Sequence, residues 1–205
     1  MKLGVLCIRR YDLLDAFVAS VLAGSRRPEK IVLVDNGGQY TAKHPDVEVL
    51  YQGPNLGVAA SWNRLLRAGV WLISNDDVIF RRDTFAELAG ALENGELFVN
   101  AGGWALFGQR PEVAERIGYY DERFYPAYYE DADYRVRLVE AGINIRSNVL
   151  SEQIGHVQWA SAESPEKVNS ICQRSYDTFI DKWGASPEVI LAQVSAAKLP
   201  GDTNA

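Results

Sequence analysis

Short apolar segments rich in β-branched residues alternate with helical patterns through the first half of this chain. We predict strands at residues 2–8, 30–35, 47–52 and 70–76. We predict helices near residues 12–23, 57–68 and 83–94. This alternation is typical of a mostly parallel sheet with helices on its faces. The first half therefore predicts a Rossmann-like, nucleotide-binding type of α/β unit.

The second half changes character, but no linker separates it from the first. Its predicted elements are a strand-like segment at 97–108, a short helix near 111–117, an aromatic loop at 119–129, a helix from about 130, a strand at 143–150 and a final packed helix at 165–183. One core can serve a chain of 205 residues, so we expect both halves to share one sheet. The expected organisation is a single α/β domain at residues 1–184, followed at 185–205 by a C-terminal helix and a flexible tail.

Charge and cysteine content argue against several classes of protein. A formal net charge of -6 argues against broad attraction to nucleic acid or anionic membranes. The N-terminal apolar run LGVLCI is too short for a signal sequence or a membrane span, and no stretch elsewhere approaches the roughly 18 apolar residues of a membrane helix. Only Cys7 and Cys172 are present, which suggests neither a disulfide framework nor a zinc site. We therefore expect a cytoplasmic protein without stable membrane insertion.

Polar side chains follow three of the predicted strands. In open α/β sheets a ligand lies beyond the carboxyl ends of the strands, where the strand order reverses. The polar residues at those ends are Arg9 and Arg10, Asp35 and Asn36, and Asn75 to Asp77. Asp35 can accept a hydrogen bond from a nucleobase or a ribose, or it can form a side-chain-stabilised turn with Asn36, and both readings stay open. These residues are the first candidates for a site.

The segment SNDDV (74–78) offers two adjacent carboxylates at the end of an apolar strand. Asp76 and Asp77 suit a hard divalent cation such as Mg²⁺ or Mn²⁺, which takes oxygen ligands. The alternative is a solvated acidic turn. His156 follows a predicted strand, although a lone histidine is more often structural than a metal ligand.

The segment NLGVAASWN (55–63) joins a turn to a helix whose apolar positions recur at helical spacing. We expect Asn55 to cap that helix and Gly57 to allow close approach of another backbone. The residues alone favour structural roles for both.

The stretch YYEDADYRVR (128–137) places three carboxylates within four positions, directly before two arginines. Asp131 with Arg135, and Asp133 with Arg137, have the spacing of ion pairs on a helix. Either all these charges face water, or one of the acids is a catalytic base.

Helix geometry separates the three acids. The face toward the core is expected to hold Ala132, Val136 and Val139. The opposite, solvated stripe is expected to hold Glu130, Asp133, Arg137 and Glu140. Asp131 belongs to neither group, and it projects from the flank at the helix N-terminus, where a carboxylate can be half buried yet ionised. That position suits a general base.

Six segments, in one order and spacing, carry a resemblance to a known family. They are VDNGG (34–38), NLGVAASWN (55–63), SNDDV (74–78), GYYDERFYPAYYEDADYRVRL (118–138), GHVQWAS (155–161) and DKWG (181–184). Across residues 2–184 the chain resembles the family-2 glycosyltransferases with the GT-A fold, and most of all the bacterial rhamnosyltransferase-type members. The resemblance implies an inverting hexosyl- or deoxyhexosyl-transferase that uses a nucleoside diphosphate sugar of the UDP or dTDP type and glycosylates an acceptor hydroxyl.

The resemblance also implies site residues, position by position. Asp131 matches the acid of the family's ED motif, which implies that it is the general base. Asp76 matches the last acid of the D-x-D motif, which implies a ligand for Mn²⁺ or Mg²⁺ on the diphosphate, and Asp77 and His156 are the other expected metal ligands. The expected donor-binding residues are Asp35 at the base, Gly102 and Gly103 below the donor sugar, and Arg9, Arg10, Asn36, Asn55, Gly57, Asn75 and Arg137. The expected acceptor-binding residues are Trp104, Tyr125, Tyr128, Tyr129 and Glu130.

Two departures from the family pattern bear on these roles. The first acid of D-x-D is Ser74 here, which leaves fewer carboxylates for a metal. At the end of the first strand, RRYD (9–12) stands where many members have a Pro-Thr-Tyr-Asn type of segment, and we hypothesise that Arg9 or Arg10 neutralises part of the diphosphate charge. The reduced D-x-D also permits an alternative, namely a catalytically inactive protein of the same fold that binds a nucleotide sugar or a glycan.

Other nucleotide-binding enzymes fit the sequence less well. A sugar-1-phosphate nucleotidyltransferase or a nicotinamide-dependent dehydrogenase needs a glycine-rich loop after the first strand, and CIRRYD has no glycine. The acceptor stays open among a glycan, a protein side chain and a modified nucleobase in DNA, so nucleic acid enters only as an acceptor.

Overall fold

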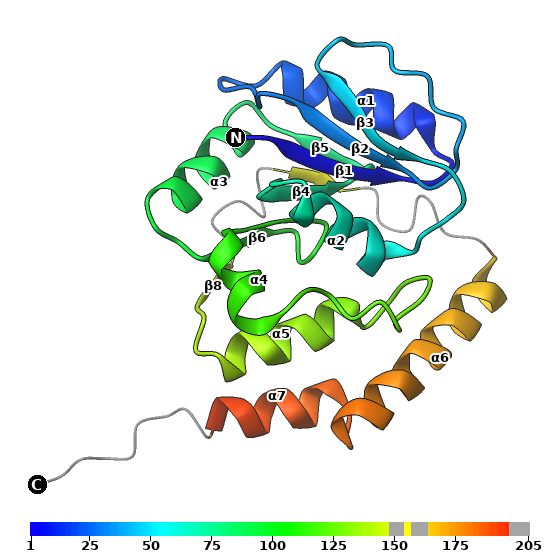
Figure 1. The fold of residues 1–205 in the computed structure, drawn as a ribbon, viewed down its shortest axis with the longest axis vertical. Helices are drawn as coiled ribbons and strands as arrows, with labels where there is room; N and C mark the ends of the chain where they lie inside the picture. Colours follow the sequence, from blue (N-terminus) through cyan, green and yellow to red (C-terminus); the bar gives the residue numbers. More distant parts are fainter. Residues whose placement is uncertain (148–153, 157–163, 197–205) are drawn as a thin grey trace, which may run out of the picture.

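A seven-stranded sheet forms the centre of the protein, and strands from both halves of the chain contribute to it (Figure 1). The computed structural model describes residues 1–147, 154–156 and 164–196. The strands of this sheet are β1 (Leu3–Cys7), β2 (Ile31–Asp35), β3 (Val47–Gln52), β4 (Leu72–Asn75), β6 (Phe98–Ala101), β7 (Leu106–Gln109) and β8 (Ile145–Ser147). Their spatial order is β3-β2-β1-β4-β7-β6-β8. Only the pairings of β7 with β4 and β6 are antiparallel, so the predicted mostly parallel α/β sheet is confirmed.

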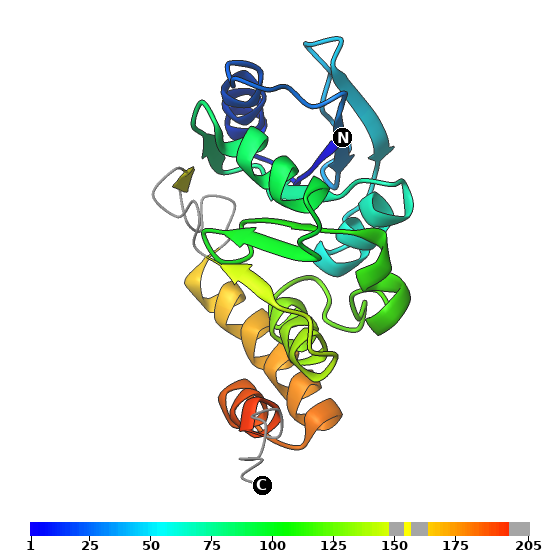
Figure 2. The ribbon, with the colours of Figure 1, turned by 90° about the vertical axis from the view of Figure 1, so that its left-hand side faces the viewer.

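Helices cover both faces of this sheet (Figures 1 and 2). They are α1 (Tyr11–Leu22), α2 (Val58–Arg67), α3 (Thr84–Glu93), α4 (Pro111–Ile117), α5 (Glu130–Glu140), α6 (Pro165–Trp183) and α7 (Pro187–Ala196). On one face, Phe17 of α1 and Leu88 of α3 share a core with Val5. On the other face, Trp62 of α2 and Tyr134 of α5 share a core with strand residues of the sheet. Because the central strands are covered on both sides, they are apolar at nearly every position. This apolar pattern is the reason that the sequence predicted them as strands.

The C-terminal helices form a further layer against α5 (Figure 1). A third core cluster joins Phe124 and Val136 to Phe179 of α6 and Ile190 of α7. The helix predicted at 165–183 is present as α6, and α7 lies within residues 185–205, where a C-terminal helix was expected.

This additional layer overturns the predicted faces of helix α5. Glu130 is 5% exposed and Asp133 is 0% exposed, so the expectation that these two acids are solvated is wrong. Tyr134 and Leu138 pack toward the sheet, whereas Val136 packs toward α6 and α7. Because α5 lies between two layers, a single core stripe could not describe it.

The second half of the chain differs from its prediction in two places. The segment expected as one strand at 97–108 is a hairpin of β6 and β7, joined by a turn at 102–105. A small antiparallel ribbon of β5 (Val78–Phe80) and β9 (Ile154–His156) was not predicted. Both errors concern strands of four residues or fewer, which carry little periodicity.

Several expectations concern segments that lie partly outside the described residues. The strand predicted at 143–150 is seen as β8, and its last residues are not described. The same holds for the tail expected after residue 196 and for most of GHVQWAS, and the division of the chain at residue 184 stays a prediction. Within the described segments, no helix combines the length and the apolar character that crossing a membrane requires.

Candidate functional site

Three parallel strands end side by side at one edge of the sheet. In the register of β1 with its neighbours, Cys7 lies opposite Asp35 of β2, and Leu6 lies opposite Asn75 of β4. The chain runs outward from β1 to β2 and β3 on one side and returns to β4 on the other side, so the strand order reverses beside β1. The segments after β1, β2 and β4 therefore meet at the point where ligands bind in open α/β sheets.

Asp35 is fully engaged inside the protein. Its Oδ1 accepts hydrogen bonds from the Tyr11 hydroxyl at 2.9 Å and from the Gly37 N–H at 3.0 Å. Its Oδ2 accepts from the Tyr40 N–H at 2.9 Å and from the Gln52 amide at 3.0 Å. Burial alone would raise the pKa of Asp35, but these hydrogen bonds hold it below its ordinary value. These contacts favour the interpretation that Asp35 stabilises the turn after β2. A contact of Asp35 with the base of a donor stays a prediction.

The buried Asn36 connects the end of β2 to the start of α2. Its amide donates to the Ser61 hydroxyl at 2.9 Å, and its carbonyl oxygen accepts from the Leu56 N–H at 3.0 Å. The predicted cap is displaced, because Asn55 accepts from the Gly57 N–H at 2.8 Å and Gly57 itself occupies the N-cap position. Asn55 therefore closes the turn that precedes the helix instead of capping it.

Gly57 allows the close approach that its sequence predicts, and the approaching segment is the aromatic loop. Its φ is 82°, and a Cβ at this position would lie 2.9 Å from the Tyr125 ring and 3.1 Å from the carbonyl oxygen of Pro126. Any larger residue would push the loop away from α2.

A cavity of about 150 Å³ lies beyond the ends of β1 and β2. It is lined by Leu6, Ile8, Arg9, Asn36, Asn55, Val58, Pro126, Ala127, Tyr128, Val168 and Ile171. Three predicted donor residues, Arg9, Asn36 and Asn55, therefore share one cavity with a predicted acceptor residue, Tyr128. The cavity is smaller than the roughly 300 Å³ at which ligand pockets begin, so it can hold one ring of a larger ligand.

The acid pair after β4 is buried. Asp76 and Asp77 are 6% and 7% exposed, and Oδ2 of Asp76 has no hydrogen-bond partner in the described part of the protein. Burial raises the pKa of Asp76 to about 6, and the negative charge of Asp77 adds to this, whereas the Cys7 thiol and the Arg10 charge act in the opposite direction. An unsatisfied buried carboxylate oxygen is costly, and a hard divalent cation would satisfy it. The acid pair fits such a cation.

Among the side chains that the structure describes, few other metal ligands lie near this pair. Ser74, the departure from D-x-D, donates its hydroxyl to the Asn75 carbonyl at 2.9 Å. The strand pairing sets the backbone of His156 opposite Val78, next to Asp77, and its side chain is not described. Within the described ranges, no group of three His, Cys, Asp or Glu side chains could hold a metal. As far as the described side chains go, the acid pair supplies the protein ligands, and oxygen atoms of water or of a bound ligand can complete the coordination of a cation.

The turn at 102–105 borders this edge, since the Asn75 N–H donates to the Ala105 carbonyl at 2.8 Å. Gly102 and Gly103 adopt φ of 62° and 69° there. A Cβ at Gly103 would meet nothing within 4 Å. Gly103 is exposed, so a side chain at this position would project into solvent.

The predicted acceptor residues separate into different surroundings. Tyr125 is 51% exposed, and Tyr128 lines the cavity. Tyr129 packs on α6, with its ring centroid 5.5 Å from that of Tyr176. Trp104 packs in an aromatic cluster, 5.1 Å from Phe98. Of these four, Tyr125 and Tyr128 have the surroundings that a ligand contact requires.

Asp131 is partly buried in the first turn of α5, as helix geometry predicted. Its Oδ1 accepts from the Ala132 N–H at 2.8 Å. Burial raises the pKa of Asp131, and hydrogen bonds from the helix N-terminus and the charge of Arg135 oppose that rise. A carboxylate with a raised pKa and one oxygen not engaged by Ala132 has the properties of a base.

Arg137 has a structural environment. Its guanidinium donates to Asp133 at 2.8 Å and 3.1 Å and to the Ile117 carbonyl at 2.8 Å, and it lies 4.7 Å from the ring centroid of Tyr134. These contacts tie α5 to the end of α4. A contact of Arg137 with the donor stays a prediction.

Two features of the site were missed from the sequence. Val168 and Ile171 of α6 line the cavity, and the Cys7 thiol hydrogen-bonds Asp76. The apolar residues at helical spacing in 165–183 predicted the helix α6. This spacing does not predict which other element the helix packs against.

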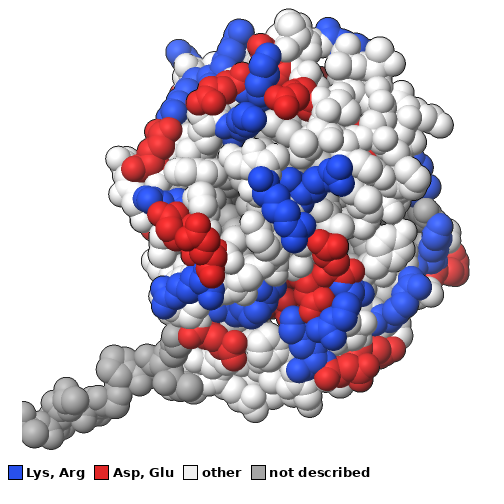
Figure 3. Space-filling model, in the orientation of Figure 1, with Lys and Arg blue, Asp and Glu red and all other residues white. Residues whose placement is uncertain are grey.

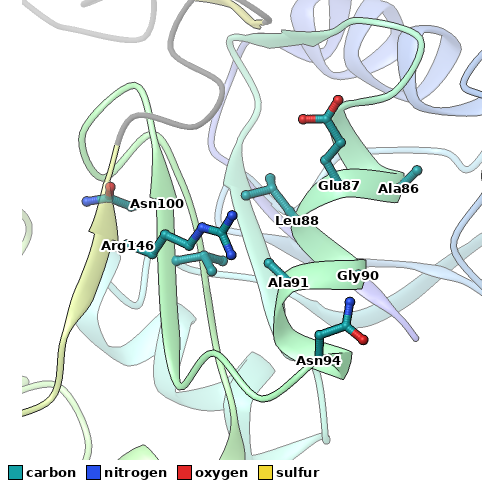
Figure 4. Close-up of a pocket in the computed structure, with 9 residues that line it drawn as sticks. Ala86, Glu87, Leu88, Gly90, Ala91, Asn94, Asn100 and Arg146 are labelled. Carbon is teal, nitrogen blue, oxygen red and sulfur yellow. The ribbon is translucent and has the colours of Figure 1, made fainter.

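A larger cavity of about 350 Å³ lies elsewhere, between α3 and the strands β6 and β8 (Figure 4). Its polar lining includes Glu87, Asn94, Asn100 and Arg146, and Arg146 pairs with Glu96 at 3.0 Å. None of the predicted site residues lines it, so size alone does not identify the site.

Comparison with known proteins finds similarity in structure and not in sequence. No protein-family model matches the chain, and no curated protein matches it either. The chain is similar to glucosyl-3-phosphoglycerate synthase from Mycobacterium tuberculosis, solved with Mn²⁺, UDP and glucosyl-3-phosphoglycerate, with a TM-score of 0.61 and 12% identity, covering 89% of this chain and 79% of that one.

Two further glycosyltransferase structures have similar scores. S. aureus TarS 1–349 matches with a TM-score of 0.57 and 12% identity, covering 95% of this chain and 69% of that one. The catalytic domain of Drosophila β1,4-galactosyltransferase 7, solved with xylobiose, matches with a TM-score of 0.56 and 14% identity, covering 77% and 70%. At these identities the likeness concerns the fold, and the chain has the GT-A fold of glycosyltransferases.

Proposed function

We propose that this protein is an inverting glycosyltransferase that moves a sugar from a nucleoside diphosphate donor to an acceptor hydroxyl. The observation that carries the proposal is the unsatisfied, buried oxygen of Asp76 at the strand edge that also borders the ring-sized cavity. A site with a cation position beside a ring pocket suits a nucleoside diphosphate. The structural neighbours solved with UDP and Mn²⁺ add support for this donor class.

The donor would lie across the ends of β1, β2 and β4. Its base would fill the cavity beside Asn55 and Tyr128, and Arg9 at the rim would face the diphosphate. Asp76 and Asp77 would hold Mn²⁺ or Mg²⁺, with His156 as a further proposed ligand. Such a cation, when bound, stabilises the negative charge that develops on the leaving diphosphate.

The chemical step needs one base on the acceptor side. The acceptor oxygen forms a bond to the donor C1 while the bond from C1 to the diphosphate oxygen breaks. The acceptor proton passes to Asp131, whose carboxylate is the proposed base. A base on the face opposite the leaving group inverts the anomeric centre.

The acceptor is a hydroxyl of a glycan, a protein or a modified nucleobase. Tyr125 is exposed in the aromatic loop, next to the loop residues that line the cavity. An aromatic ring can stack on the apolar face of a sugar. On the face of the molecule in Figure 3, basic and acidic side chains alternate, so that face offers no continuous basic surface for a polyanion. These features favour a glycan acceptor.

Calorimetric titration with UDP and dTDP tests the donor half of this proposal. We expect binding that strengthens at least about tenfold when Mn²⁺ is added, because the cation joins the acid pair to the diphosphate. Equal affinity with Mn²⁺ and with a chelator would mean that the site works without a metal.

Replacement of the arginines after β1 tests the diphosphate contact. Arg9→Ala or Arg10→Ala is expected to weaken donor binding by about tenfold, since a charge-assisted hydrogen bond contributes about 1.5 kcal/mol or more. Arg67→Ala serves as a control, because Arg67 is exposed on α2 and pairs with Glu122. The hypothesis is wrong if both Arg9→Ala and Arg10→Ala bind donor as the wild type does.

Asp76→Asn is expected to stabilise the metal-free protein at neutral pH. The pKa of Asp76 is raised from 3.8 to about 6, so the folded wild type keeps a proton that the unfolded chain releases. Wild-type stability therefore falls as the pH rises from 3.8 to about 6, and the variant avoids a loss of as much as about 3 kcal/mol. The gain should be complete above about pH 6 and absent below pH 3.8.

Thermal unfolding at several pH values, with and without Mn²⁺, measures both halves of this prediction. Mn²⁺ should raise the melting temperature of the wild type and leave that of Asp76→Asn unchanged. A variant that is less stable than the wild type at pH 8, or that responds equally to Mn²⁺, would contradict it.

A further inference from the structure

Glu130, the first residue of α5, is buried without a full set of partners. It is 5% exposed, and its Oε2 has no hydrogen-bond partner in the described part of the chain. The next residue is Asp131, the proposed base. Two carboxyl groups therefore lie next to each other at the start of one helix, and one of them is cut off from water.

Among the described residues, none of the groups that interact electrostatically with Glu130 is a cation. The charge of Asp131 acts on it from α5 and disfavours the anion, whereas a hydrogen bond from its own backbone N–H favours the anion. Its charge also acts on three groups that are not cations, namely Tyr120 and Tyr128 of the aromatic loop and Cys172 of α6. Arg135, which acts on Asp131, is not among the influences on Glu130.

The balance of these effects favours the neutral acid. Burial disfavours a charged carboxylate, and a neighbouring carboxylate disfavours it further, whereas a helix N-terminus offsets only a small part of the cost. Burial accordingly raises the pKa of Glu130 well above its ordinary value. A protonated carboxyl also gains a donor, so it is easier to satisfy in an apolar site.

We propose that Glu130 keeps its proton in the folded protein and acts as a positioning residue that leaves Asp131 as the single charged carboxylate at the start of α5. If both acids competed for one charge, Asp131 would be protonated part of the time and could not accept a proton. Tyr128, which interacts electrostatically with Glu130, lines the cavity. The protonation itself does not depend on the proposed function, whereas its effect on turnover rests on it.

Infrared spectroscopy tests the protonation directly. The wild type at pH 7 should show the carbonyl band of a protonated, buried carboxyl group, Glu130→Gln should lack it, and Asp131→Asn should keep it. A wild type without the band, or a band that disappears only in Asp131→Asn, would overturn the proposal whatever the protein catalyses.

The pH dependence of unfolding gives a second measurement. The folded wild type keeps a proton that the unfolded chain releases above pH 4.5, so the wild type loses stability relative to Glu130→Gln as the pH rises above that value. The ratio of the two unfolding constants should change by about tenfold per pH unit up to the raised pKa. A ratio that is constant between pH 5 and pH 8 would contradict the proposal.

The pH profile of turnover shows which of the two acids carries the charge. Because a protonated Glu130 leaves Asp131 as the only charged carboxylate at the start of α5, the acidic limb of turnover should report Asp131 alone and should lie at the same pH in the wild type and in Glu130→Gln. An acidic limb that moves to lower pH in Glu130→Gln would show that Glu130 is charged beside Asp131 and would overturn the positioning role. An infrared band at Glu130 in a protein that shows no sugar transfer would instead contradict the proposed function alone.

Discussion

Asp131→Asn is expected to reduce sugar transfer by about 10³-fold while leaving the affinity for the donor close to that of the wild type. The amide keeps the size of the side chain and can still accept from the Ala132 N–H, but it cannot take a proton. The loss should therefore appear in turnover and not in donor binding. Initial rates and calorimetric titration with the donor and Mn²⁺ measure the two quantities separately.

Glu140→Gln is the matched control for this experiment. Glu140 ends the same helix and is exposed, so its neutralisation should change turnover by less than about twofold. Wild-type turnover in Asp131→Asn would remove Asp131 as the base. Equal losses of donor affinity and turnover would show that the substitution disturbs the site as a whole.

Asp133→Ala is expected to lower the free energy of unfolding by about 3–5 kcal/mol. Asp133 is fully buried, and its Oδ2 accepts from Arg137 at 2.8 Å and 3.1 Å. Its Oδ1 accepts from the Trp183 indole at 2.9 Å and pairs with Lys182 at 2.6 Å. Truncation would leave two cationic side chains without this partner, of which Arg137 is only 15% exposed. The cost is large because one carboxylate holds α6 against α5.

Urea denaturation measures this change. Asp133→Asn should lose less stability than Asp133→Ala, because the amide oxygen can still accept one of these hydrogen bonds. Asp181→Ala, an exposed change on the same stretch of α6, should stay within about 0.5 kcal/mol of the wild type. A loss below about 1 kcal/mol in Asp133→Ala would mean that α6 docks by apolar contacts alone.

The fold was predictable where local pattern and tertiary contact agree. Strands β1, β2 and β4 are apolar at nearly every position because they are covered on both faces, and this local signal reveals them. The burial of Asp133 was not predictable, because its partners Lys182 and Trp183 stand some fifty residues away. The spacing of apolar residues along α5 predicts one buried face. It does not predict that α6 and α7 cover another face of the same helix.

The candidate site shows the same division. Polar residues at the ends of parallel strands had to meet, so the neighbourhood of Arg9, Asp35 and Asp76 follows from strand order. Strand order does not predict that α6 lines the cavity. Ile171 and its neighbours form an apolar pattern that would fit contact with any apolar surface. The four hydrogen bonds that Asp35 accepts could not be predicted from the sequence either, because two of the donors are backbone N–H groups.

Release of nucleoside diphosphate from a panel of UDP- and dTDP-linked sugars measures the proposed transferase activity. Water can replace the unknown acceptor, so slow hydrolysis suffices for detection. We expect release from at least one donor in the presence of Mn²⁺, and we expect this release to be suppressed in both Asp131→Asn and Asp76→Asn. Donor binding without release, with every acceptor class tried, would favour a nucleotide-sugar or glycan-binding protein, and release that is unchanged in both variants would contradict the site.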